Sequence, residues 1–229
     1  HPSVLIYSCG NESYAGEDIV NMANYFRATD PTRLVHYEGC TWNRDYSEAT
    51  DMESRMYAKA KDIEDYLQNA PKKPYISCEY MHAMGNSLGG MEKYIELEDQ
   101  YEKYQGGFIW DYIDQAISHT NDFGEKVLGY GGDFDDRNTD YNFCGDGIVF
   151  ANRMPSPKAD EVKYQYQDII LKVDESGVSI RSKRLFKDTS DLIFKYQATQ
   201  GKEVIREGAF EAIVKPQEEI HVPIDFGTF

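Results

Sequence analysis

Residues 74–112 read PYISCEYMHAMGNSLGGMEKYIELEDQYEKYQGGFIWDY, and this stretch decides the fold. It contains two short apolar runs, Tyr75–Cys78 and Gly107–Trp110. Such runs are typical of strands that are covered on both faces in a parallel sheet. Between them, residues 88–104 repeat tyrosine and leucine at helical spacing, and we expect the glycine pair 106–107 to end that helix. The stretch therefore predicts a strand–helix–strand unit.

The same alternation extends along the chain on both sides of this unit. Residues 17–28 and 62–69 carry helical patterns, and residues 158–167 predict a last short helix. Residues 111–157 are rich in Gly, Asp and Asn and lack periodicity, which is typical of a functional loop region. Alternating strands and helices predict an α/β fold, either a doubly wound sheet or a (β/α)8 barrel, of which about five units are present. The three further strands are expected at Val4–Tyr7, Leu34–Tyr37 and Met52–Tyr57.

The character of the sequence changes near Asp168, where we expect a domain boundary between residues 1–168 and 169–229. The first part holds 15 basic and 30 acidic residues, whereas the second holds 9 and 10. The second part shows strand patterns separated by turn residues, which indicates an antiparallel sandwich shorter than the usual ~100 residues. The expected strands are Ile169–Val173, Val178–Ser182, Asp191–Thr199, Lys202–Phe210 and Glu219–Pro223.

Charge and composition exclude several classes of partner. The 229 residues include 24 Lys and Arg against 40 Asp and Glu, a net charge of −16, which argues against nucleic acid or an anionic membrane surface. No apolar run approaches the ~18 residues of a membrane-spanning helix. Four widely spaced cysteines form no zinc pattern and indicate buried, reduced thiols. The chain starts at His1 without a Met, so we expect a piece of a longer polypeptide. A start that is not the native one carries no targeting information, and the cytoplasmic location that we expect does not rest on it.

Carboxylates gather where the predicted strands end. Glu12, Glu38, Glu79 and Asp111 each follow one of the five strands, and the carboxyl ends of such strands meet at one mouth. A single strand-end glutamate is more commonly a helix-terminal or salt-bridged residue. Two carboxylates that face each other are what glycoside hydrolysis needs, and neighbouring aromatic rings such as that of Trp110 suit the apolar faces of sugars. The joint placement favours a glycosidase.

Four segments resemble glycoside hydrolase family 2, in the form found in β-galactosidases. They are residues 8–13 (SCGNES), 78–87 (CEYMHAMGNS), 106–112 (GGFIWDY) and 142–147 (NFCGDG). The resemblance implies a retaining mechanism on terminal β-D-galactosides, in a (β/α)8 TIM barrel of which the five strands are strands four to eight. It also implies that an incomplete immunoglobulin-like β-sandwich follows the barrel.

The resemblance also implies roles for individual residues. Glu79 matches the nucleophile, and Glu12 matches the acid/base, which also contacts a magnesium ion. The Phe143 carbonyl and Asp146 match a sodium site, although the best-known member has Asn at the position of Asp146, which leaves the need for sodium open. The residues that match substrate-binding positions are Asn11, Tyr57, His82, Trp110 and Asp146.

Two other functions compete with a β-galactosidase. Another family 2 specificity, such as β-glucuronidase, needs cationic or amide partners for a sugar carboxylate, and the acidic first part and residues 82–87 argue against it. A non-catalytic carbohydrate-binding fragment is disfavoured because both glutamates are present. The implied partners are a β-galactoside and the rest of the polypeptide, and the resemblance is compatible with a homo-oligomer of the full-length form. Residues 1–229 alone are expected to be insoluble or partly folded, and inactive, because an open barrel leaves bare strand edges.

Overall fold

The computed structural model describes residues 1–226 and divides the chain into two compact units, His1–Gln165 and the part from Tyr166 onward. The expected boundary lies at Asp168, close to this division. Each unit is a separate body with its own core. Within the described residues, none of the helices is both long enough and apolar enough to cross a membrane.

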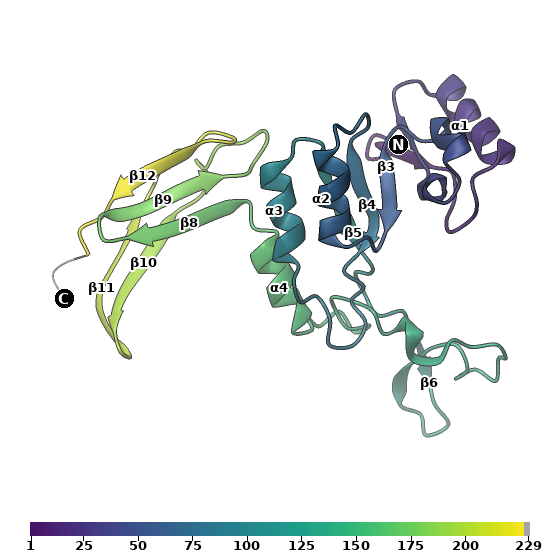
Figure 1. Ribbon diagram of the computed structural model, residues 1–229. Helices are drawn as coiled ribbons and strands as arrows, with labels where there is room; N and C mark the ends of the chain where they lie inside the picture. Colours follow the sequence, from purple (N-terminus) through teal and green to yellow (C-terminus); the bar gives the residue numbers. More distant parts are fainter. Residues whose placement is uncertain (227–229) are drawn as a thin grey trace. The chain divides into compact units, whose positions relative to one another are not determined.

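Five short parallel strands organise the first unit, and all five were expected from the sequence (Figure 1). One sheet pairs β1 with β2, and a second has the order β3-β4-β5. Their bounds are β1 (Ile6–Ser8), β2 (Leu34–His36), β3 (Glu53–Met56), β4 (Tyr75–Tyr80) and β5 (Tyr104–Ile109). No closed sheet forms among the described residues, which makes the unit a mixed α/β structure with an open row of strands.

The two sheets of this unit are linked at β2 and β3 by hydrogen bonds rather than by a ladder. The Asp51 amide donates to the Val35 carbonyl at 2.8 Å, and the Val35 amide donates to Asp51 Oδ2 at 2.7 Å. One residue further along β2, His36 Nε2 lies 2.7 Å from Oγ of Ser54 in β3. These contacts keep the carboxyl ends of all five strands on one side.

Helices cover the strands because their apolar residues fall on one face. Helix α1 (Glu17–Thr29) packs Ala23 against Val35 in β2. Helices α2 (Ala60–Gln68) and α3 (Glu92–Gln100) lie beside each other over the β3-β4-β5 sheet (Figure 1). Their shared core comprises Ile63, Leu67, Tyr75, Leu97 and Tyr104.

The expected helix over 88–104 is too long. Helix α3 ends at Gln100, and Tyr104 is the first residue of β5, where it pairs with Tyr75. The glycine pair lies inside the strand instead of ending a helix. A Cβ at Gly107 would stand 2.8 Å from the Cβ of Ser77, so the close approach of β5 to β4 requires glycine there.

The long irregular region contains a hairpin that the sequence did not predict. Strands β6 (Ile117–Thr120) and β7 (Lys126–Gly129) pair antiparallel, and the 3-10 turn η3 (Tyr141–Cys144) follows. Helix α4 (Lys158–Gln165) closes the unit near its expected place. Two more 3-10 turns, η1 (Glu38–Thr41) and η2 (Arg44–Ala49), lie between β2 and β3.

The second unit contains two antiparallel sheets around one core. Strands β8 (Ile169–Asp174), β9 (Gly177–Ser182) and β12 (Glu219–Pro223) form a sheet of order β12-β9-β8, and β10 (Phe194–Gln200) pairs with β11 (Glu203–Phe210). All five expected strands are present. Val178 and Ile180 from one sheet and Phe194 from the other belong to the same buried cluster.

Candidate functional site

Glu79 lies near the carboxyl end of β4, where Tyr57 from the end of β3 binds it. The Tyr57 hydroxyl donates a hydrogen bond to Glu79 Oε2 at 2.7 Å, and the Tyr57 amide donates to the Glu79 carbonyl at 2.8 Å. Burial raises the pKa of the Tyr57 phenol, and the hydrogen bond to Glu79 raises it further. The phenol therefore stays protonated and remains a hydrogen-bond donor to the carboxylate.

The backbone beside this pair adopts unusual conformations. Tyr57 has a φ of 54° and Met81, two residues after Glu79, a φ of 51°. Left-handed conformations of residues other than glycine cost about 1–3 kcal/mol each and collect at functional sites. Both positions are directly beside the carboxylate that the sequence assigns as nucleophile.

Glu12 lies in the loop after β1 and has a φ of 51°. Its backbone amide donates to Glu38 Oε1 at 2.6 Å. The charges of Glu79, Glu12 and Asp146 each raise the pKa of Tyr57, so all three carboxylates lie within electrostatic reach of one hydroxyl. Glu79 thus contacts Tyr57 directly, whereas Glu12 acts on the Tyr57 hydroxyl only through its charge.

The predicted sugar-binding residues meet at Asp146, which is 1% exposed. Trp110, directly after β5, donates from its indole Nε1 to Asp146 Oδ2 at 2.9 Å. His82 Nε2 lies 4.0 Å from the same oxygen, and the His82 ring lies 5.7 Å from that of Tyr57 and 5.5 Å from that of Phe143. One continuous cluster therefore joins these side chains to Glu79.

Asn11 shares a cavity with Glu79. A cavity of about 300 Å³ is lined by Asn11 and Glu79 together with residues of the strand interior. The Asn11 carbonyl accepts the Ser13 hydroxyl at 3.3 Å. The assigned residues that lie at or shortly after the ends of β1, β3, β4 and β5 are Asn11, Glu12, Tyr57, Glu79, His82 and Trp110. Phe143 lies in η3, and Asp146 follows it.

Asp146 has the properties of a cation ligand. Its Oδ1 atom is buried and accepts no hydrogen bond within the described part of the chain, while Trp110 holds Oδ2. A buried carboxylate oxygen without a partner is costly, and hard cations such as sodium take oxygen ligands. Glu12, by contrast, does not belong to any group of three or more His, Cys, Asp or Glu side chains placed to share a metal ion among residues 1–226.

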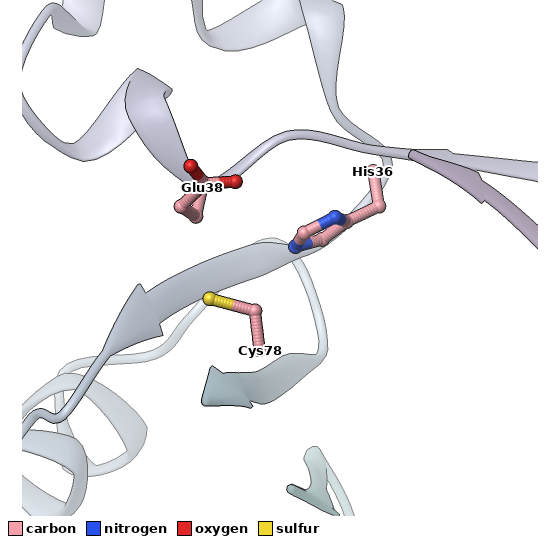
Figure 2. Close-up of side chains that lie close together, drawn as sticks. All are labelled: His36, Glu38 and Cys78. Atoms are coloured by element: carbon pink, nitrogen blue, oxygen red, sulfur yellow. The ribbon is translucent and has the colours of Figure 1, made fainter. Parts of the chain in front are cut away.

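The structure contains a cluster of buried polar side chains near the carboxyl ends of the strands that was not predicted from the sequence. Figure 2 shows His36 and Glu38 from the end of β2 beside Cys78 of β4, with one potential ligand atom of each within 4.8 Å of the others. The His36 ring nitrogens face the hydroxyls of Ser8 at 3.2 Å and Ser54 at 2.7 Å. Burial lowers the pKa of His36 and raises that of Cys78 to about 11, so both are neutral near pH 7.

The signal for this group lay in the register of the strands. Ser8 pairs with His36 across β1 and β2, and Ser54 follows on β3. Polar residues at matching positions of successive apolar strands point to a polar interior, because each side chain faces the same side. Which hydrogen-bond partner each of these polar side chains has, however, depends on the three-dimensional structure.

Residues 1–171 match the family described as "Glycosyl hydrolases family 2, TIM barrel domain". The chain is 60% identical over 227 residues to a β-galactosidase of Halalkalibacterium halodurans, covering 99% of this chain and 22% of that protein. It is 56% identical to a β-galactosidase of Clostridium acetobutylicum, covering 100% of this chain and 25% of that protein. The chain thus spans about a quarter of the length of the curated relatives it matches.

A solved structure of a β-D-glucuronidase from Dictyoglomus thermophilum shares the fold. It aligns with a TM-score of 0.51 at 17% identity, over 72% of this chain and 32% of that one. At this identity the likeness concerns the fold alone. The match over residues 1–171 covers well over half of the 229 residues, and the chain therefore belongs to glycosyl hydrolase family 2.

Proposed function

We propose that this chain carries both catalytic glutamates of a retaining β-galactosidase, with Glu79 as nucleophile and Glu12 as acid/base. The observation that carries the proposal is the hydrogen bond from Tyr57 to Glu79 Oε2. The charges of Glu12 and Asp146 also raise the pKa of the Tyr57 phenol. The names of the curated relatives, at 56–60% identity, support the galactoside as substrate.

In the first step, Glu79 attacks the anomeric carbon. Tyr57 occupies Oε2, which leaves Oε1 to form the bond to that carbon. As the bond to the leaving oxygen breaks, Glu12 gives its proton to that oxygen. The two carboxyl groups of retaining enzymes are about 5–5.5 Å apart, and we expect this separation here.

In the second step, water releases the sugar. Glu12, now a carboxylate, takes a proton from a water molecule whose oxygen attacks the anomeric carbon. The ester bond to Glu79 breaks, and the carboxylate that reappears is stabilised by the Tyr57 hydroxyl. Two inversions give net retention of configuration.

Galactose recognition is assigned to His82, Trp110 and Asp146, with Asn11 toward the 2-OH. The Trp110 ring offers an apolar face to the sugar, and polar groups built for the axial 4-OH and the 6-OH reject analogues that lack them. Asp146 and the Phe143 carbonyl would hold a sodium ion, which would supply positive charge toward the 6-OH. A magnesium ion at Glu12 would depend on ligands from elsewhere in the polypeptide.

The fold of both units supports the assignment to a family 2 β-galactosidase. We infer that β1 to β5 are the last five strands of a (β/α)8 barrel, whose remaining units come from the rest of the polypeptide. The shared core of the two antiparallel sheets in the second unit supports an immunoglobulin-like sandwich. A cytoplasmic location stays a prediction.

The test is hydrolysis by the full-length protein of a panel of nitrophenyl β-glycosides. We expect the galactoside to be the preferred substrate and Glu79→Gln to abolish its turnover. The matched control is Glu64→Gln, because Glu64 is a glutamate of α2 that binds Lys61 and Tyr101 away from the site. A preference for the glucuronide would refute the assigned sugar, and binding without hydrolysis of any glycoside would refute catalysis.

A further inference from the structure

The two residues that follow β2 hold the loop that carries Glu12. Glu38 is 3% exposed, and its Oε1 accepts the backbone amide of Glu12 at 2.6 Å. Tyr37, 1% exposed, donates its hydroxyl to the carbonyl of Ser13 at 2.6 Å. Two consecutive buried side chains thus bind backbone groups of two consecutive loop residues, Glu12 and Ser13.

The next residue, Gly39 in η1, completes this contact. A Cβ at Gly39 would stand 2.1 Å from the Ser13 carbonyl oxygen, so the loop lies directly against the backbone there. Glu12 itself has a φ of 51°, a conformation that persists only where the surroundings hold it. A carboxylate is suited to this task, because charge-assisted hydrogen bonds to backbone amides are short and about twice as strong as neutral ones.

We propose that Glu38 is a positioning residue that fixes the main chain at Glu12, so that the acid/base carboxylate faces the leaving group. This inference rests on the function proposed above. In this role Glu38 does not contact the substrate and acts only through Glu12. Tyr37 holds the same loop through the hydrogen bond from its hydroxyl to the Ser13 carbonyl.

The expected effect depends on the leaving group. A displacement of about 1 Å of a catalytic group costs about 100-fold in rate, so Glu38→Ala should lower kcat on lactose by about that factor. A nitrophenyl galactoside leaves with little help from an acid, so its first step should change little. Glu38→Gln keeps an acceptor oxygen for the Glu12 amide and should lose less than Glu38→Ala.

The experiment measures kcat and KM of the full-length enzyme on lactose and on a nitrophenyl galactoside, with and without azide, across pH. Glu38→Ala, Glu38→Gln and Tyr37→Phe are compared with Glu64→Gln, after thermal melts verify that each is folded. We expect the loss of kcat on lactose to be largest in Glu38→Ala, smaller in Glu38→Gln and smallest in the control Glu64→Gln. We also expect the alkaline limb of the pH profile on lactose to shift in Glu38→Ala. We also expect azide to restore the nitrophenyl rate and to yield galactosyl azide. Tyr37→Phe removes only one hydroxyl, so it tests the loop contact even if Glu38→Ala does not fold.

Three results would overturn the inference: equal losses of kcat/KM, which reports the first step, on both substrates; no loss on lactose in either Glu38 variant; or no response of the nitrophenyl rate to azide. Each would be read against a wild-type enzyme that hydrolyses galactosides. A wild type without that activity would refute the proposed function instead, which separates the two failures.

Discussion

Replacing Tyr57 by Phe removes the hydroxyl that holds the proposed nucleophile. The hydrogen bond to Glu79 Oε2 is 2.7 Å long and has an ionised acceptor. Hydrogen bonds to charged groups contribute about 1.5–3 kcal/mol, which corresponds to about 10- to 150-fold in rate. The remaining question is which of the two chemical steps carries this loss.

The direction follows from the charge on Glu79 in each step. In the first step the carboxylate becomes an ester, so a hydrogen bond that stabilises the charge favours the ground state. In the second step the charge returns to Glu79, and the same hydrogen bond stabilises the transition state. Tyr57→Phe should therefore slow release of galactose far more than formation of the ester.

Stopped-flow measurements with a nitrophenyl galactoside distinguish the steps. We expect a rapid burst of nitrophenol in Tyr57→Phe, followed by a steady rate about 10- to 150-fold below wild type, with a lowered KM. Tyr66→Phe is the matched control, because its hydroxyl donates to the Lys73 carbonyl away from the site. A slow first step without a burst would show that Tyr57 does not act on the leaving carboxylate.

Three further predictions concern the acid/base, the sugar subsite and acid stability. Glu12→Ala should impair lactose far more than a nitrophenyl galactoside and be rescued by azide on the latter; equal losses would contradict its role. His82→Ala and Trp110→Ala should each raise KM for galactosides, and Asp146→Asn should change any response of KM to sodium; unchanged constants would refute the subsite. Burial lowers the pKa of His36 in the folded state, so the unfolded state takes up this proton at a higher pH than the folded state does. Stability should therefore be fully present above pH ~6.5 and decline below it by at most about 1.4 kcal/mol per pH unit from this residue, and denaturant titrations should show a shallower decline in His36→Gln.

Apart from β6 and β7, the strands could be predicted from the sequence, because they are short apolar runs or strand patterns between turn residues. The error at α3 has a physical reason. Tyr101 and Tyr104 continue the helical spacing of Tyr94 and Leu97, yet Tyr104 belongs to β5 and packs in the same core. The β6-β7 hairpin was missed because its strands are short and largely exposed, so no core face imposes an alternation of apolar residues.

The site was predictable to the extent that it depends on strand ends. Glu12, Glu38 and Glu79 follow strands, and parallel strands bring their carboxyl ends together. The contact of Glu38 with the Glu12 amide was not predictable, because it depends on the path of one loop. The same holds for Asp146 and Trp110, which are 36 residues apart and meet through the folding of the intervening region.

The identity of the nucleophile is the central claim, and a trapping reagent tests it most directly. A 2-deoxy-2-fluoro-galactosyl fluoride reacts through the first step and leaves a slowly hydrolysed ester on the attacking carboxylate. After digestion of the labelled full-length enzyme, mass spectrometry should find one galactosyl group per chain, on Glu79. A label on Glu12 or Glu38, or an enzyme that turns over galactosides without becoming labelled, would contradict the account.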